Sequence, residues 1–388
     1  ETPIFDLIQL YLYMILNLKV RLLMLSIIIL GLISCSPSQK DSTIIFESLV
    51  SEEFQTFLSS TELEVIPLKT NEAVIGDFSM VRMVSDELYV FSGQQGKVHR
   101  FDDSGNFINT IGQIGDGPSE YRGPAGFVIS GDSLIILSQK KGTSSLYFYS
   151  NQGEFIKSMD FEESTYPSFE LTDFGYVFST GGNTIFENKY NLHSRNFKGE
   201  LIGKFYPIID RAMFSIGVNN FGRGENCSLY FEPFNNQVYK IEKDSLIPTH
   251  KFDFGDFNLK ENAFDSEDPY ENFERIMNNG MAFILAYSES KNYAYFNIIL
   301  QKNPDKPEVF HLLLNKKTRA SRLIKSVEET TPAFQFMNGD RLLFLFHAGD
   351  VLNLAKLYPE AFAGSEDVIR DVKMDDNPIV VITKIDFL

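Results

Sequence analysis

The chain has 388 residues, of which 43% are hydrophobic and 14% aromatic, a composition that supplies enough apolar side chains for a full core. Its formal net charge of −17 argues against a nucleic-acid partner, because phosphate binding requires clustered Lys and Arg. The same charge argues against broad adhesion to anionic lipid. We interpret it as the solubilising surface of a secreted protein.

The N-terminal region has the pattern of a signal peptide. Lys19 and Arg21 precede the apolar run Leu22–Ile33, which is short for a membrane span and suited to a signal sequence. The run ends in Leu32-Ile33-Ser34-Cys35, which resembles the lipobox of bacterial lipoproteins. This resemblance implies cleavage before Cys35 and lipid attachment to its sulfur, giving stable anchoring to a membrane. A coincidental Cys after an ordinary signal peptide, or a membrane hairpin that includes Leu7–Leu18, are the alternatives.

These features predict three segments. Residues 1–34 are expected to be the signal peptide, with Met14 as the start and residues 1–13 not translated. Residues 35–60 are expected to be the lipidated Cys and a tether, and residues 61–388 the folded domain. The other cysteine, Cys227, stands in the strand-like context NCSLYF, where a lone Cys is typically a small buried hydrophobe.

A turn motif recurs through the first half of the domain. The stretches DSGNFI, NQGEFI and FKGELI each join a polar turn, a Gly and two apolar residues, and their glycines Gly105, Gly153 and Gly199 lie 48 and 46 residues apart. Glycine suits the left-handed conformation of such hairpins. A hairpin repeated at this period indicates a blade repeat.

Six apolar runs accompany these turns, and each is expected to be a buried inner strand packed on both faces. They are Leu88–Phe91, Leu134–Leu137, Tyr176–Phe178, Leu229–Phe231, Tyr293–Phe296 and Leu342–Phe346. The fold class we predict is therefore all-β, a six-bladed β-propeller of four-stranded antiparallel blades. Two helical insertions interrupt it, one opened by Asp268-Pro-Tyr-Glu271 and ended near Gly280, the other within Val351–Ile369. Both are expected on one face of the ring.

The sequence contains no recognisable catalytic or metal motif. The five His are scattered singly, without the spacing of a zinc site. No G-x-S-x-G elbow is present, and the acidic run Asp265–Asp268 lacks calcium-loop spacing. Lys140, Lys141 and Arg223 fall in expected loops, where contact with solvent is the ordinary explanation. We therefore expect no metal and no cofactor.

The glycine-rich stretch Ile111–Tyr121, IGQIGDGPSEY, requires an explanation. A phosphate loop needs a Lys after its last Gly and a helix behind it, whereas Gly117 is followed by Pro118 and then by another strand. We interpret Gly115, Gly117 and Pro118 as a tight crossover between the outer strand of one blade and the next blade.

This stretch also carries a family resemblance. Residues 61 to about 130 resemble the first blade of six-bladed, NHL-like β-propeller lipoproteins of Bacteroides-like bacteria, through an entry strand ending in P-L, a blade ending in F-D-x-x-G and the signature G-x-G-P-x-E-Y. Asp376-Asn-Pro-Ile379 is similar to that family's ending, whereas Ser119 stands where Gly is common. The resemblance implies an outer-membrane, lipid-anchored protein that faces the periplasm or the cell surface.

In such rings the crossovers share a face with the loops between second and third strands. We therefore expect Glu120, Tyr121 and Arg122 to lie near Gln94, Lys140 and Lys141 at the mouth of the channel, as a binding surface. A second interpretation of Glu120, Tyr121 and Arg122 is a structural cross-link between two blades, and we favour it over ligand binding.

Two functions remain open. The first is a binding or scaffold module for a glycan, a peptide or a partner protein, attached to the membrane through Cys35. The second is a hydrolase or lyase with a divalent cation in the central channel.

Overall fold

The structure is a computed structural model, and it describes residues 43–70, 73–76, 80–140, 142–161, 165–182, 189–208, 220–224, 227–232, 234–302, 306–326 and 334–385. The expected signal peptide and Cys35 lie outside these residues. Residues 43–388 form one compact unit. No helix within the described residues is long and apolar enough to span a membrane.

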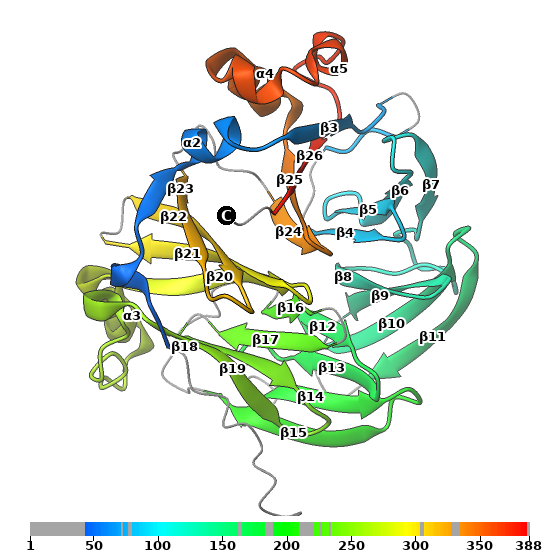
Figure 1. The fold of residues 1–388 in the computed structure, drawn as a ribbon. Coiled ribbons are helices and arrows are strands. Elements are labelled where there is room, and N and C mark those ends of the chain that lie inside the picture. Colours follow the sequence, from blue (N-terminus) through cyan, green and yellow to red (C-terminus); the bar gives the residue numbers. More distant parts are fainter. Residues whose placement is uncertain are drawn as a thin grey trace, which may run out of the picture. The chain divides into compact units, whose positions relative to one another are not determined.

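The domain is a ring of six blades, each built on four antiparallel strands (Figure 1). Four blades are separate sheets, whereas blades 4 and 5 join with two additional strands into one ten-stranded sheet. Blade 1 comprises β4 (Met80–Val84), β5 (Glu87–Ser92), β6 (Lys97–Phe101) and β7 (Phe107–Ile111). Blade 2 comprises β8 (Pro124–Ser130), β9 (Ser133–Lys140), β10 (Thr143–Ser150) and β11 (Phe155–Phe161). Blade 3 comprises β12 (Ser168–Leu171), β13 (Gly175–Ser179), β14 (Tyr190–Asn196) and β15 (Leu201–Pro207). Blade 4 comprises β16 (Phe221–Arg223), β17 (Ser228–Glu232), β18 (Asn235–Ile241) and β19 (Leu246–Asp253). Blade 5 comprises β20 (Met281–Glu289), β21 (Tyr293–Gln301), β22 (Pro307–Asn315) and β23 (Ser321–Ser326). The predicted six-bladed propeller is confirmed.

Blade 6 joins the two ends of the domain and closes the ring. Its first three strands are β24 (Phe334–Asn338), β25 (Arg341–Phe346) and β26 (Ile379–Lys384), and its outer strand is β3 (Leu63–Pro67). Strand β3 pairs antiparallel with β26. The buried Asn377 side chain reinforces this closure, because it accepts from the Ile75 amide at 2.8 Å and donates to the Ala73 carbonyl at 2.6 Å.

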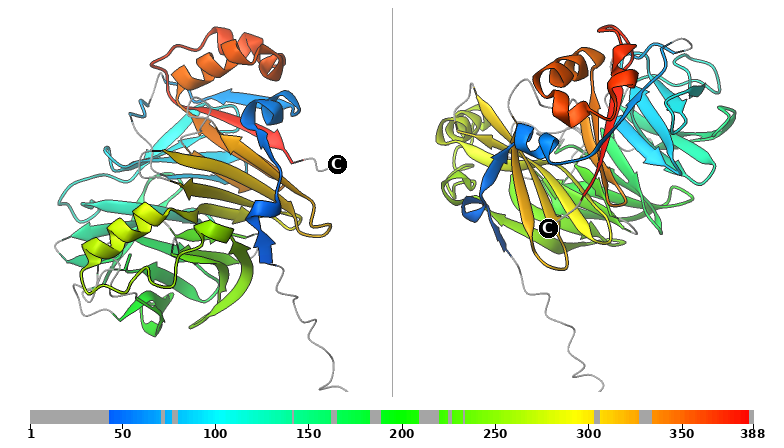
Figure 2. Two further views of the ribbon diagram at one scale, coloured as in Figure 1. Left: turned by 90° about the vertical axis from the view of Figure 1, so that its left-hand side faces the viewer. Right: turned by 45° about the horizontal axis from the view of Figure 1, so that its top comes forward.

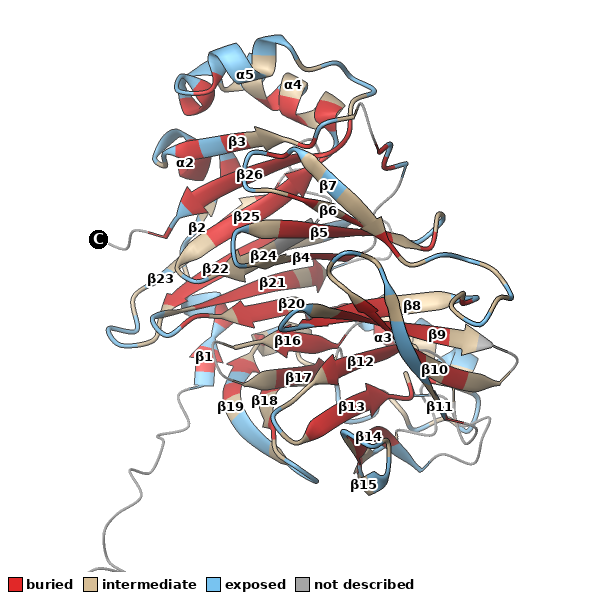
Figure 3. Ribbon diagram, turned by 90° about the vertical axis from the view of Figure 1, so that its right-hand side faces the viewer, coloured by how far each residue is buried: buried red, intermediate tan, exposed pale blue. Residues whose placement is uncertain are grey.

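The six apolar runs identified in the sequence are the second strands of the blades, one position further from the axis than we expected. The first strands line the axis instead, and those of blades 4 and 5 pair directly at Arg223 and Ser288. The second strands are still buried on both faces, as Figure 3 shows for β5 and β13.

Alternation along each second strand builds the core. In β5, Tyr89 and Phe91 pack into the apolar cluster between blades 1 and 2, whereas Leu88 and Val90 pack into the cluster between blades 6 and 1. Successive side chains of a strand point to opposite faces, so each strand contributes to two interfaces. Within the described residues an apolar cluster of this kind lies at each of the six blade junctions.

Residues 43–60, which we expected to belong to a tether, are part of the folded domain. Strand β1 (Thr43–Ile45) adds in parallel to the edge of β19, and β2 (Ser51–Glu53) adds in parallel to the edge of β23. The short helix η1 (Phe46–Ser48) connects them. Helix α2 (Phe54–Ser59) then packs its buried apolar side chains into the junction of blades 5 and 6. The buried apolar side chains of this segment are Ile44, Phe46, Phe54, Phe57 and Leu58, which pack against blades 4, 5 and 6.

The recurring glycines occupy the turns between third and fourth strands. Gly105, Gly153 and Gly199 have φ of 76°, 89° and 84°, a region that glycine adopts without steric cost. Each glycine amide donates to the carbonyl three residues earlier, which closes the same turn in blades 1, 2 and 3. The repeat read from the sequence is therefore a repeat of backbone geometry.

Antiparallel pairing gives the ring two different faces. We call the face with the crossovers and the second-to-third-strand loops the crossover face, represented by residues 112–123 and 93–96. The opposite face, with the first-to-second and third-to-fourth turns, is the hairpin face, represented by residues 85–86 and 102–106. The Tyr121 hydroxyl donates to the Gly96 carbonyl at 2.6 Å, which joins a crossover directly to a loop of the same face.

Both helical insertions enter the ring at the crossover face, as expected. Helix α3 (Pro269–Asn279) begins after Asp268, whose side chain accepts from the Tyr270 amide, and ends at Gly280 with φ of 72°; it lies in the crossover from β19 to β20, which begins with helix η2 (Gly255–Phe257). The second insertion joins β25 to β26 and contains α4 (Ala348–Leu357), η4 (Pro359–Phe362) and α5 (Glu366–Arg370). Figure 2 shows both insertions outside the blades.

Candidate functional site

A buried ion triad occupies the axis of the ring. Arg82 lies on β4, Glu170 on β12 and Arg223 on β16, so the first strands of three blades each contribute one side chain. The two Glu170 oxygens are divided between the arginines: Oε2 accepts from Arg82 Nη2 at 3.0 Å and Oε1 from Arg223 Nη2 at 3.3 Å. We call these three residues the axial triad.

The axial triad is strongly desolvated at Arg82 and Glu170, whose side chains are 8% and 3% exposed. Burial, together with repulsion from Arg223, lowers the pKa of Arg82 to about 10. The pKa of Glu170 is lowered, because the attraction of the two arginines and their hydrogen bonds outweighs the effect of burial. Arg82 is also held by the Phe127 carbonyl, which accepts from its Nε at 3.0 Å.

A cavity of about 330 Å³ adjoins the axial triad at the hairpin face. We call it the axial cavity; blades 3 and 4 form most of its wall, and Glu170 and Arg223 are among the residues that line it. We use floor for the side of the cavity at the axial triad, and rim for the side lined by the exposed Asp173 and the partly exposed Lys240 and Glu242. Lys240 Nζ and a Glu242 oxygen are 2.7 Å apart. A volume of this size falls at the lower end of that of small-molecule sites.

Cys227 lies in the wall of the axial cavity and is half-buried. We expected a small buried hydrophobe; Cys227 packs against the apolar cluster between blades 4 and 5 but is only partly buried, because it also lines the cavity. Burial raises the pKa of its thiol, and the nearby Glu289 carboxylate raises it further. A thiol whose pKa is raised is a weak nucleophile, because the reactive species is the thiolate.

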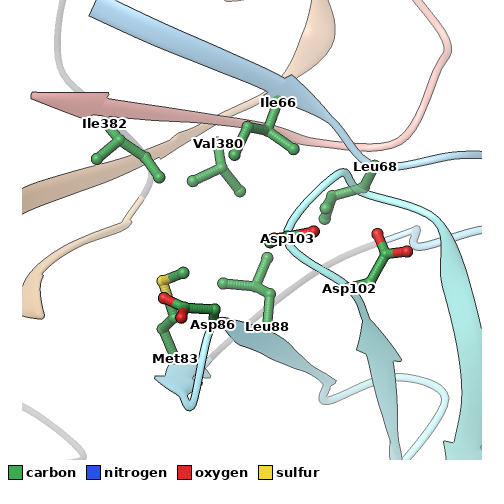
Figure 4. A pocket seen from close by; sticks show the side chains of 9 residues that line it. All are labelled: Ile66, Leu68, Met83, Asp86, Leu88, Asp102, Asp103, Val380 and Ile382. Carbon is green, nitrogen blue, oxygen red and sulfur yellow. The ribbon is translucent and has the colours of Figure 1, made fainter.

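A second, much smaller cavity lies between blades 6 and 1 (Figure 4). Its volume is about 10 Å³, enough for about one water molecule. Asp86, Asp102 and Asp103 stand beside its apolar lining. Asp86 forms an ion pair with Arg341 at 3.1 Å, and Asp102 accepts hydrogen bonds from its own turn. These carboxylates stabilise turns, and the cavity has no room for a ligand.

The crossover from blade 1 to blade 2 is packed as a lock between blades. Tyr121 is 1% exposed and its hydroxyl is bound to Gly96, so our expectation that it lines a binding surface is wrong. The Glu120 carboxylate accepts from the Gly117 amide at 2.9 Å, and a Cβ at Gly115 would overlap that carboxylate. The Tyr121 ring is part of the apolar cluster that fills the space between blades 1 and 2, and this packing buries it.

The other residues of the predicted surface have different positions. Gln94 is exposed on the crossover face. Arg122 is exposed and forms an ion pair with Asp116, with Nε and Oδ1 2.7 Å apart. The Lys140 side chain and Lys141 lie outside the described residues. A ligand on the crossover face stays a prediction, whereas the axial cavity opens on the hairpin face.

Sequence reasoning missed the axial triad. Arg223 was assigned to a solvent-exposed loop, but it ends β16 and pairs with Glu170 across the axis. The sequence did contain a signal for the triad, because Arg82 and Glu170 are charged residues within short, largely apolar first strands. These strands read Met80-Val-Arg-Met-Val84 and Ser168-Phe-Glu-Leu171. Within the described residues no three His, Cys, Asp or Glu side chains are grouped so that they could hold a metal ion.

Comparisons with known proteins identify the family. Residues 47–384 match the family described as Domain of unknown function (DUF4934). The chain belongs to the DUF4934 family. The match covers nearly the whole propeller of this DUF4934 protein, including β2, which adds to blade 5, but it begins after β1.

Two solved structures with TM-scores above 0.5 share its fold, and a third is less similar. A Bacteroides fragilis protein that is thought to be exported is 13% identical, with a TM-score of 0.70 over 87% of this chain and 98% of its own. A DUF4221 family member from Bacteroides vulgatus is 12% identical, with a TM-score of 0.54 over 87% and 97%. Virginiamycin B lyase from Staphylococcus aureus is 10% identical, with a TM-score of 0.42 over 84% and 100%. No curated protein matches the sequence significantly.

Proposed function

We propose that this DUF4934 protein is an exported, lipid-anchored binding module of the outer membrane, facing the periplasm or the cell surface. The propeller holds a small ligand in the axial cavity. The single observation that carries this proposal is the cavity itself, about 330 Å³ in volume and floored by Glu170 and Arg223. Concave sites with a few convergent polar groups are the usual form of a small-molecule site.

The pKa shifts around the cavity favour binding over catalysis. General acid–base catalysis is most efficient when the pKa of the catalytic group lies near the working pH. Here the pKa of the Glu170 carboxyl is lowered by its two arginines, and burial raises the pKa of the Cys227 thiol. Both shifts move the group away from neutrality, so each side chain is better suited to holding a ligand than to exchanging protons with it.

The location rests on the N-terminal pattern. The lipobox-like Leu32–Cys35 supports export and lipid attachment, and the similar fold of a Bacteroides fragilis protein thought to be exported agrees with it. Thr43 is the first residue that the structure describes, and seven residues separate it from Cys35 in the sequence.

Ligand capture tests the function. The full chain, purified in detergent, is incubated with a low-molecular-weight extract of bacterial envelopes, and native mass spectrometry detects what it retains. The control is Ser228→Trp, which places an indole in the axial cavity. We expect a retained mass that is lost in Ser228→Trp and a recovered compound that is chemically unchanged. Recovery of a cleaved product would favour the hydrolase or lyase instead, and retention by Ser228→Trp would exclude the cavity.

Acyl labelling tests the anchor. Cys35→Ala should abolish incorporation of a labelled fatty acid and release the protein from membranes. Cys227→Ala is the matched control, because it removes the other cysteine of the chain and should leave labelling unchanged. Persistent labelling of Cys35→Ala would refute the lipid anchor.

A further inference from the structure

We propose that the ligand of the axial cavity carries a carboxylate, which binds to the guanidinium of Arg223. This inference rests on the proposed function, and it specifies the chemical class of the ligand. Three observations support it: the net charge of the axial triad, the greater exposure of Arg223 than of Arg82, and the ion pair between Lys240 and Glu242 at the rim.

The axial triad has an excess of positive charge. It contains two guanidinium groups and one carboxylate, and each oxygen of Glu170 already accepts from a different arginine. An uncompensated charge in a desolvated site is costly, and a paired charge with good hydrogen bonds is much less so. A ligand anion beside the triad would make the count of charges equal, two positive and two negative.

The two arginines differ in what remains available to a ligand. Arg82 is 8% exposed and donates both to Glu170 and to the Phe127 carbonyl, so it is committed to the protein. Arg223 is 39% exposed and lies in the cavity wall. Within the described part of the chain its one hydrogen bond is from Nη2 to Glu170, whereas a guanidinium has five donors. The remaining fork matches the geometry of a carboxylate.

The rim limits how much negative charge the ligand can carry. Lys240 and Glu242 neutralise each other at 2.7 Å, and Asp173 is exposed. Asp173 would repel a second anionic group near the opening, so polyanions fit poorly. The arrangement favours one carboxylate at the floor and an uncharged polar remainder at the rim. Sugar acids and acylated amino acids both have this chemistry.

Two matched pairs of compounds test the charge. D-Glucuronate is compared with D-glucose, and N-acetyl-L-alanine with its amide, by isothermal titration calorimetry on the full chain in detergent. We expect the acid of at least one pair to bind about tenfold or more tightly than its neutral counterpart, the range of a charge-assisted bidentate contact. The pair that shows the preference distinguishes a sugar source from a peptide source. Absence of binding by both acids at about 10 mM would overturn the carboxylate assignment.

Two variants test whether the preference for the acid depends on Arg223. Arg223→Gln should remove the preference for the acid, so that acid and neutral compounds bind equally weakly. Arg341→Gln is the matched control, because Arg341 is a 33% exposed arginine of the same face that pairs with Asp86. It should retain the full preference. A preference that survives in Arg223→Gln, with an unchanged thermal midpoint, would overturn the proposal.

A third variant separates this inference from the proposed function. If Ser228→Trp abolishes binding while the wild-type chain binds acid and neutral compounds equally, the cavity holds a ligand and only the carboxylate assignment fails. If Ser228→Trp leaves binding unchanged, the axial cavity is not the site and both proposals fail.

Discussion

Arg82 and Glu170, which are 88 residues apart in the chain, meet at the axis with Nη2 and Oε2 separated by 3.0 Å. They come from the first strands of blades 1 and 3, and Arg223 of blade 4 joins them. A contact among three blades ties the ring together at its centre. Removing one of its charges should therefore cost more stability than breaking a surface ion pair.

Glu170→Gln should destabilise the fold strongly, because it leaves Arg82 charged and buried without an anion. Breaking one partner out of a buried ion pair typically costs about 3–5 kcal/mol. Denaturant unfolding of the full chain measures the change. Arg122→Gln, which breaks the exposed pair with Asp116, is the control and should leave the unfolding midpoint unchanged. Equal effects of the two substitutions would contradict a special role for the axial triad.

Gly112→Ala should disrupt the crossover lock. Gly112 has φ of 88°, and a Cβ there would overlap the Tyr121 hydroxyl oxygen. Gly131 is a matched control with φ of 55° and no atom within 4 Å of an added Cβ. Both variants bear the backbone strain of about 1 kcal/mol, but only Gly112→Ala also displaces a buried tyrosine. Thermal unfolding should show a clearly larger loss for Gly112→Ala, and similar losses would refute the lock.

Phe54→Ala should show that residues before position 61 belong to the core. Phe54 is fully buried at the junction of blades 5 and 6, and truncation of a buried Phe typically costs about 3–5 kcal/mol. Its neighbour Gln55 is exposed, so Gln55→Ala should change stability by less than about 0.5 kcal/mol. Chemical denaturation measures both. A small effect of Phe54→Ala would restore the longer tether that the sequence suggested.

His311 should make stability fall in mild acid. Burial lowers its pKa to about 3, from an ordinary value of 6.5. Because the unfolded chain takes up this proton first, the stability present above pH 6.5 is lost progressively as the pH falls toward about 3. Near pH 4.5 the loss approaches about 2.7 kcal/mol, two pH units below the unfolded value.

The variant His311→Gln isolates this effect from other titrating groups. At neutral pH the variant should be less stable than the wild type, because the hydrogen bonds that join the His311 ring to the hydroxyl groups of Tyr295 and Ser326, both 2.7 Å, are disturbed. The difference in unfolding free energy should shrink or reverse near pH 4.5. Parallel pH profiles for the two proteins would show that His311 is not the responsible group.

Much of the fold could be predicted from local sequence patterns. The glycine turns at Gly105, Gly153 and Gly199, the apolar second strands and the Asp268 cap of α3 all depend on neighbouring residues, so a single sequence displays them. The candidate site depended on other information. Arg82, Glu170 and Arg223 are distributed over more than 140 residues, and each by itself resembles an ordinary charged residue.

The sequence by itself determined the number of blades, the crossover at Ile111–Tyr121 and the places where helices interrupt the ring, because apolar runs, glycine conformation and helix caps act over a few residues. Tertiary structure alone decided that β1 and β2 add to blades 4 and 5, that Tyr121 is buried and that three charged side chains converge beside a cavity. Those outcomes depend on which blades become neighbours when the ring closes, and that closure brings together residues whose separation along the chain carries no local signal.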